Sequence, residues 1–398
     1  MENQPAKKKE LPAFEGSPPE ETGFHQERFN TMAREYEKSP VKKILNLNAK
    51  MSPKDFAHTE AIRDDADFER RKDEEFHAWE KNLKVVVGHL LEKRDHGTER
   101  KDIRPLLLIL GGGMKGASGA GQALIGLPAV GLDTVFDTVV GISAGAPTAA
   151  YFIGGREQSA KGASIFYEEC TEGEFINTSV KRLPRIMDID VVTEAMSHGE
   201  KALEKQKVLD SRTDFFVVAT GKKDGRGELI DAKTAQPGMM NAIAASMAVP
   251  IAYKKAIEVN GKEYVDGTFS PVPLEEIVKK FNPTDILVLP QVPFNRTDAF
   301  ELNFGEKIVA EFAHRFDSLN TVEKFLRIKE EIRKSMEYIQ KQKGVHIGVL
   351  WPPDSALNPL TTDPDQVEAA VMESARGVIR TFGAAQPGKL DIFHSRRQ

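Results

Sequence analysis

The chain has 398 residues, of which 40% are hydrophobic and 29% charged, a composition typical of globular proteins. Its formal net charge of −5 excludes a strong overall positive field, so we expect no nucleic acid among its partners. The single cysteine, Cys170, excludes an intrachain disulfide and fits a reducing compartment. The nine histidines are scattered and form no cluster with the cysteine, so the sequence predicts no metal site.

Residues 1–102 are predicted to form a charged, partly disordered helical extension. Residues 1–23 are polar and proline-rich, and they contain no apolar core of a signal peptide. Residues 24–96 are charged and helix-prone, with the clearest helix from Arg70 to Leu91. We expect the extension to pack on the main domain; a regulatory or partner-binding arm is the alternative. The lack of a signal peptide favours a cytoplasmic protein, with export by another route left open.

The uncharged segment from Thr138 to Gly155 is about long enough to cross a bilayer. It contains several glycines, a serine and Pro147, which are unusual together in a membrane span. We therefore predict a buried strand, a sharp turn and a buried helix here, and no transmembrane segment.

The main domain is predicted over residues 103–398, because the composition changes at Ile103. The aliphatic run Leu106–Leu110 is typical of a buried parallel strand, and a glycine-rich turn and a helix follow from Gly111 to about Val130. The other predicted elements are strands at Thr134–Val140, Asp214–Thr220, Ala256–Val259, Asp285–Leu289 and Val345–Leu350, and helices at Asn303–Lys343 and Asp365–Thr381. Strands that alternate with helices indicate an α/β sandwich with a mostly parallel sheet.

The motif Gly141-x-Ser143-x-Gly145 follows a predicted strand and precedes a predicted helix. Strand, tight turn and helix in this order favour a nucleophile elbow, in which the glycines permit a sharp turn and close packing. The serine would then lie at a helix N-terminus, where unpaired N–H groups favour developing negative charge. A structural turn with a capping serine is the other interpretation of this motif alone.

A glycine loop, Gly111-Gly112-Gly113-Met114-Lys115-Gly116, comes directly after the first predicted strand. Its spacing also fits a dinucleotide fingerprint, which requires an acid at the end of the second strand. Asp133 precedes that strand and Asp137 lies within it, so neither fits. The alternative use of such a loop is an oxyanion hole, whose bare N–H groups stabilise a carbonyl oxygen that becomes negative. Loops after adjacent parallel strands share one sheet edge, so we expect this loop beside Ser143.

A serine nucleophile needs a group that accepts its proton. Asp266 ends a short apolar hairpin just before Gly267, and a desolvated carboxylate can act as this base. A plain Asp-Gly turn is the other interpretation. The histidines after Ser143 are His198, His314, His346 and His394. Of these, His346 at a strand edge is the best candidate for a Ser-Asp-His triad.

Together these motifs resemble the patatin-like phospholipase family. The first similar stretch runs from Leu106 to Ala146 and includes the glycine loop and the serine motif. The second begins with Ala245-Ser246-Met247-Ala248-Val249-Pro250 and leads through the hairpin Asn260–Gly267 to Pro271-Val272-Pro273-Leu274. The resemblance covers roughly residues 104–383.

The resemblance implies a three-layer α/β/α fold and a Ser–Asp dyad without histidine. It implies that Ser143 is the nucleophile, that Asp266 activates it, and that Gly111, Gly112 and Gly113 form the oxyanion hole. Lys115 matches the basic position of that loop, and Gly116, Gly141, Gly145 and Gly267 are the supporting glycines. The implied substrate is a phospholipid or another acyl-ester lipid, cleaved by a phospholipase A-type, lysophospholipase or esterase reaction without metal or organic cofactor. The lysine pairs Lys42-Lys43 and Lys254-Lys255 are candidates for transient contact with a membrane surface.

Thr268 departs from the family pattern, which has Gly or Ala after the aspartate and glycine of the dyad. A β-branched residue tolerates a positive φ badly, so we expect strain or a different loop shape here. Two alternatives to the dyad hydrolase therefore stay open. One is a catalytically weak or inactive lipid-binding protein on the same fold, and the other is an α/β-hydrolase esterase that uses His346.

Overall fold

The computed structural model describes residues 66–177, 187–250, 252–253, 255–270, 272–291, 293, 344–355 and 357–385. Several sequence-based predictions lie outside these residues: the extension before residue 66, the helix Asn303–Lys343, the histidines His314 and His394, and Lys42, Lys43 and Lys254.

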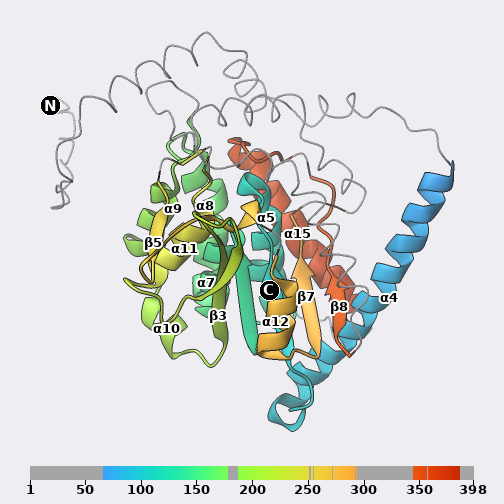
Figure 1. Ribbon diagram of the computed structural model, residues 1–398. Coiled ribbons are helices and arrows are strands. Elements are labelled where there is room, and N and C mark those ends of the chain that lie inside the picture. Colours follow the sequence, from blue (N-terminus) through green and yellow to red (C-terminus); the bar gives the residue numbers. More distant parts are fainter. Residues whose placement is uncertain are drawn as a thin grey trace, which may run out of the picture.

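A mixed sheet forms the centre of the described domain (Figure 1). Its strands are β1 (Pro105–Ile109), β2 (Thr138–Ile142), β3 (Asp214–Gly221), β4 (Gly227–Asp231), β5 (Ile257–Val259), β6 (Lys262–Asp266), β7 (Asp285–Leu289) and β8 (His346–Val349). The order across the sheet is β5-β6-β3-β2-β1-β7-β8, and β4 pairs with β3. The pairs that join β3, β2, β1, β7 and β8 are parallel, whereas β4 and β6 run antiparallel to β3. The mostly parallel α/β sheet predicted from the sequence is confirmed.

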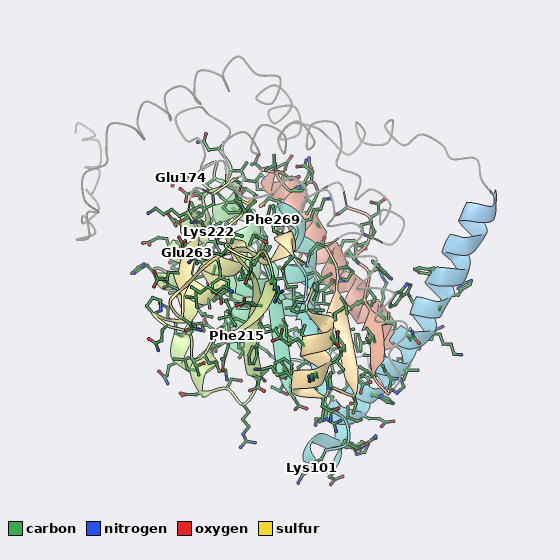
Figure 2. All side chains as sticks on the ribbon, in the orientation of Figure 1. Lys101, Glu174, Phe215, Lys222, Glu263 and Phe269 are labelled. Carbon is green, nitrogen blue, oxygen red and sulfur yellow. The ribbon has the colours of Figure 1, made fainter. Side chains whose placement is uncertain are left out.

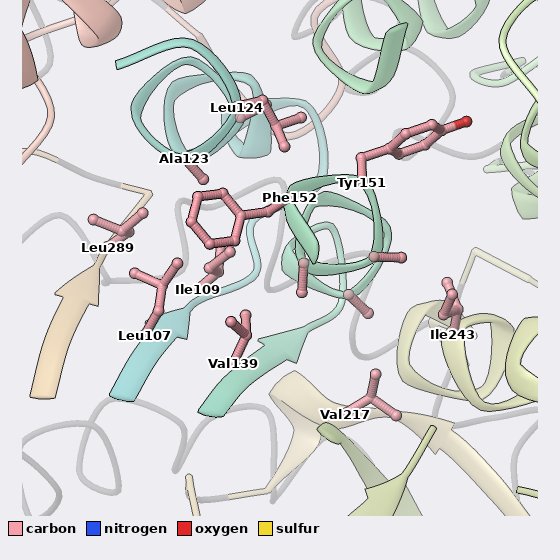
Figure 3. Close-up of a cluster of buried hydrophobic side chains, with 14 of the residues drawn as sticks. Leu107, Ile109, Ala123, Leu124, Val139, Tyr151, Phe152, Val217, Ile243 and Leu289 are labelled. Atoms are coloured by element: carbon pink, nitrogen blue, oxygen red, sulfur yellow. The ribbon is translucent and has the colours of Figure 1, made fainter. Parts of the chain in front are cut away.

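Both faces of the parallel strands are buried, which explains their uninterrupted aliphatic sequences. In β1, Leu107 and Ile109 belong to one hydrophobic cluster, whereas Leu106 and Leu108 belong to the cluster on the other face. Figure 3 shows the first cluster, where the side chains of β1 and its neighbouring strands gather against Phe152. The helices on the two sides complete the three layers.

Most described helices contribute to the first cluster. The described helices are α4 (Ala66–His96), α5 (Gly116–Ala120), α6 (Leu127–Ala129), α7 (Gly145–Ile153), α8 (Arg156–Tyr167), α9 (Ile189–Ser197), α10 (Lys205–Asp210), α11 (Met239–Met247), α12 (Leu274–Phe281) and α15 (Pro364–Ala384). A π-helical segment, η3 (Gly121–Gly126), joins α5 to α6, so the helix predicted after the glycine loop is continuous to residue 129. Helix α12 packs on the opposite face through Leu274 and Ile277 (Figure 1).

Helix α4 is longer than predicted and packs along β8 and β7. Val86, Val87, Leu90 and Leu91 are buried in the first cluster. Further along the chain, the short strand β8 begins at His346. The figure shows α4 running beside β8 and extending beyond it (Figure 1). The charged helix therefore carries an apolar stripe that covers this edge of the domain.

The second strand differs from its prediction. Residues 134–137 form turn and coil, and β2 covers Thr138–Ile142. The N–H of Asp137 donates to the carbonyl of Pro105, outside the regular ladder, whereas Gly141 and Ile142 pair with the neighbouring strands. Gly141, predicted in the turn, is thus a strand residue. Among the described helices, none is long and apolar enough to cross a membrane.

Candidate active site

Ser143 occupies a sharp turn between β2 and α7. Its φ of 51° lies in the left-handed region, and its carbonyl accepts the N–H of Ala146 at 2.8 Å. A Cβ on Gly145 would lie 2.2 Å from the carbonyl oxygen of Ile109, so only glycine fits where the turn enters the helix. The strand, strained turn and helix have the form of a nucleophile elbow.

Asp266 is the last residue of β6, and the antiparallel pairing of β6 with β3 brings it to the sheet edge where β2 ends. The Ser143 hydroxyl donates to Asp266 Oδ2 at 2.6 Å. The Asp266 side chain is fully buried, and this burial raises its pKa from 3.8 to about 6, although its hydrogen bonds lower it. The structure therefore brings together a serine hydroxyl and an unusually basic carboxylate that are 123 residues apart.

Thr268 contacts the second oxygen of the same carboxylate. Its N–H and its hydroxyl donate to Asp266 Oδ1 at 2.8 and 2.7 Å. The strain expected here is absent, because the described non-glycine residues with positive φ are Ser143, Asn260 and Asn282. The expectation was wrong because Asp266, Gly267 and Thr268 form an Asx turn that continues into the 3-10 helix η6 (Gly267–Phe269), a conformation that a β-branched residue tolerates.

The glycine loop lies beside Ser143, because β1 and β2 are adjacent parallel strands. A Cβ on Gly111 would lie 2.5 Å from the Ser143 Cβ, so glycine is required for this approach. Gly113 has a φ of 57°. Within the described residues, the N–H groups of Gly111, Gly112 and Gly113 donate no hydrogen bond. These groups can therefore donate to an anionic oxygen near Ser143.

The remaining predicted residues surround these groups. Lys115 is half-buried in the 3-10 segment η2 (Gly113–Lys115), which follows the loop. A Cβ on Gly116, Gly141 or Gly267 would lie 2.5 Å or less from a neighbouring atom, so these glycines permit close packing around the elbow. The site lies at the upper end of the sheet in Figure 2, where Phe269 is labelled, and Lys101 marks the opposite end.

A narrow apolar cavity opens beside Ser143, between α7, α8, α9 and α11. Two other hydroxyl-bearing side chains line it. Thr148 donates its hydroxyl hydrogen to the carbonyl of Ala144, and Tyr151 donates to the carbonyl of Lys201. Because both hydroxyl groups have partners, the cavity suits an apolar ligand.

Residues 107–278 match the model of the patatin-like phospholipase family, a stretch that runs from β1 through the elbow and Asp266 to α12. The chain contains a patatin-like phospholipase domain.

The similarities found to solved structures are distant. VipD from Legionella pneumophila is 11% identical, with 70% of this chain and 67% of that chain covered and a TM-score of 0.34. A chain of the full-length SpcU–ExoU complex from the type III secretion system of Pseudomonas aeruginosa is 18% identical, with a TM-score of 0.26. That match covers 58% of this chain and 53% of the chain in the complex. This chain therefore spans about half the length of that one. No curated protein sequence matches the chain.

Of the alternative partners of Ser143, the structure describes His198 and His346. His346 is the first residue of β8 and pairs with Asp285 at the beginning of β7, whereas Ser143 follows the end of a strand parallel to both. A five-residue strand spans roughly 15 Å, so His346 cannot contact Ser143. His198 is exposed beside Glu194. Asp137 was considered above as the acid of a dinucleotide-binding fingerprint. It also lies at the end of the sheet where His346 lies.

The motifs did not indicate two buried polar side chains that support the site. Ser246 of α11 accepts the N–H of Ser143 at 2.9 Å. Gln291, which follows β7, donates to the carbonyl of Leu110 and accepts the N–H of Gly119, so it holds the segments on both sides of the glycine loop. Ser246 lies within the second similar stretch, which is the signal that could have identified it; Gln291 has no such signal.

Proposed function

We propose that the patatin-like domain hydrolyses acyl esters of lipids, with Ser143 as nucleophile and Asp266 as its general base. The contact of 2.6 Å between the Ser143 hydroxyl and the buried Asp266 carboxylate carries this proposal. A carboxylate with a pKa near 6 is charged at neutral pH and is more basic than an ordinary aspartate. The match of residues 107–278 to the model of the patatin-like phospholipase family supports the same reaction class.

In the first half of the reaction, Asp266 accepts the hydroxyl proton while Ser143 Oγ attacks the ester carbonyl. The carbonyl oxygen becomes negative, and the N–H groups of Gly111, Gly112 and Gly113 stabilise it. When the intermediate collapses, the bond to the leaving oxygen breaks and Asp266 returns its proton to that oxygen. An alcohol or lysophospholipid leaves, and the acyl group remains on Ser143.

In the second half, water attacks the acyl-enzyme and Asp266 accepts a proton from it. The same oxyanion donors stabilise the second tetrahedral intermediate. Collapse releases the fatty acid and returns the proton to Ser143 Oγ, which restores the free enzyme. Every proton transfer in this scheme uses the single carboxylate, which is why its burial and its pKa matter.

The cavity beside Ser143 supports a lipid substrate. An acyl chain has no hydrogen-bonding groups, and the described walls of this cavity are aliphatic, aromatic or sulfur-bearing apart from hydroxyl groups that already have partners. We infer that the acyl chain enters this cavity when the ester carbonyl lies between Ser143 and the glycine loop. This places the head group or glycerol toward solvent.

Labelling by a fluorophosphonate, followed by assays on phospholipid vesicles, tests the proposal. Wild type should be labelled and should release fatty acid, whereas Ser143→Ala should not be labelled and Asp266→Asn should lose roughly a thousandfold or more in rate. Ser374→Ala is the matched control, because Ser374 is a buried serine like Ser143 but lies in α15 and has no hydrogen-bond partner in the described structure. A folded wild type that binds vesicles without labelling or turnover would replace the hydrolase with a lipid-binding protein.

A further inference from the structure

Asp266 has two carboxylate oxygens with different partners. Oδ2 accepts the hydroxyl hydrogen of Ser143, whereas Oδ1 accepts two hydrogen bonds from Thr268, one from the backbone N–H and one from the side chain. A carboxylate oxygen has two lone pairs, so Thr268 occupies both acceptor sites of Oδ1. Only Oδ2 then has capacity to receive the proton of Ser143.

Two further hydrogen bonds to backbone carbonyls stabilise the turn that carries Thr268. The hydroxyl of Thr220 on β3 donates to the carbonyl of Asp266, and the hydroxyl of Ser270 donates to the carbonyl of Gly267. The Thr268 methyl group faces the glycine loop, because a Cβ on Gly111 would lie 2.8 Å from Thr268 Cγ2. Thr268 therefore contacts both the carboxylate and the loop that flanks Ser143.

We propose that Thr268 is a positioning residue of the dyad, whose hydroxyl fixes the rotation of the Asp266 carboxylate so that Oδ2 faces Ser143. Any residue except proline could supply the N–H, but the second hydrogen bond requires a side-chain donor, which the Thr268 hydroxyl provides. The same bond stabilises the charged carboxylate and opposes the rise in pKa that burial causes. This inference rests on the proposed function, because it assigns Thr268 a role in the same dyad.

Two substitutions separate the contribution of the Thr268 hydroxyl from that of its methyl group. Thr268→Val keeps the shape and the N–H but removes the hydroxyl, whereas Thr268→Ser keeps the hydroxyl and removes the methyl group. We expect the acid limb of the pH profile for fluorophosphonate labelling to move up by about one pH unit in Thr268→Val, since a hydrogen bond to a carboxylate is lost. The rate above that limb should fall by a factor of roughly ten, because one of the two hydrogen bonds that orient the carboxylate is lost. In Thr268→Ser, which keeps the hydroxyl, the acid limb should lie at the same pH as in wild type.

A measurement without turnover distinguishes this inference from the proposed function. The carboxyl carbon of Asp266 can be titrated by NMR in aspartate-labelled protein, with the signal assigned by its absence in Asp266→Asn. Its titration midpoint should rise in Thr268→Val and return in Thr268→Ser. If fluorophosphonate does not label wild type but the NMR midpoints show this pattern, the proposed hydrolase is overturned. The role of Thr268 in positioning Asp266 is then retained. Midpoints and acid limbs that coincide in wild type and Thr268→Val would overturn the role of Thr268.

Discussion

The backbone N–H of Ser143 donates to the hydroxyl of Ser246, 2.9 Å away and 103 residues later in the chain. The Ser246 hydroxyl in turn donates to the carbonyl of Val218 on β3 at 2.6 Å. A buried serine on α11 thus joins the Ser143 turn to the strand that pairs with β6. Because this N–H is occupied, the proposed oxyanion donors come from the glycine loop and not from Ser143 itself.

Ser246→Ala should weaken both folding and reactivity. It leaves the Ser143 N–H buried without its acceptor, which costs roughly 1–3 kcal/mol of unfolding free energy. The Ser143 turn also loses a restraint, so fluorophosphonate labelling should slow. Urea unfolding and labelling rates measured beside Ser374→Ala check this, because that control also removes a buried hydroxyl. Equal behaviour of the two variants would show that the Ser246 bond has no role at the elbow.

The strained backbone of Ser143 predicts an unusual order of stability. Its φ of 51° disfavours any residue with a Cβ, so Ser143→Gly should be more stable than Ser143→Ala by roughly 1 kcal/mol, although both lack the proposed nucleophile. At Ser374, inside helix α15, the order should reverse, because glycine is the poorer helix former. Urea unfolding of the four variants measures both differences. The same order at both positions would contradict strain at Ser143.

The raised pKa of Asp266 predicts how stability depends on pH. The folded protein holds this proton up to about pH 6, whereas the unfolded chain releases it near the ordinary pKa of 3.8. The free energy of unfolding therefore falls as pH rises through this window and stays reduced above it. Asp266→Asn does not titrate, so it should be more stable than wild type above pH 7, by roughly 2–3 kcal/mol, and should lose this advantage near pH 4. Thermal unfolding across the pH range provides the measurement, and a constant difference would contradict the buried, charged dyad.

The parts of the site that depend on short-range sequence were predictable. The turn at Ser143 needs glycine on either side, and the Asp266 turn is a local Asx turn, so each leaves a motif. The adjacency of the glycine loop and Ser143 follows from parallel neighbouring strands. A short residue pattern can predict such local geometry because the few residues that form the turn are neighbours in the sequence.

The supporting contacts were not predictable because each joins distant segments. Gln291 reaches Gly119 across 172 residues, and nothing near Gln291 in sequence indicates that a loop needs it. The strain expected at Thr268 is absent for a local reason, because the Asx turn at Asp266 keeps Thr268 out of the positive-φ region. The bounds of β2 also depended on pairing, because Gly141 has a low strand propensity but lies between two strands that pair with it.

The cavity predicts that chain-length preference can be altered without changing the dyad. Cys170, a buried residue in the 3-10 segment η4 (Glu169–Thr171), lines the same cavity as Ser143. Cys170→Leu adds volume, so turnover of long-chain p-nitrophenyl esters should fall relative to short-chain esters by roughly tenfold, a typical effect of a crowded apolar pocket. Cys170→Ala is the matched control and should not lower this ratio. Fluorophosphonate labelling should persist in both variants, since neither touches Ser143 or Asp266. A ratio that does not change in Cys170→Leu would place the acyl chain outside this cavity.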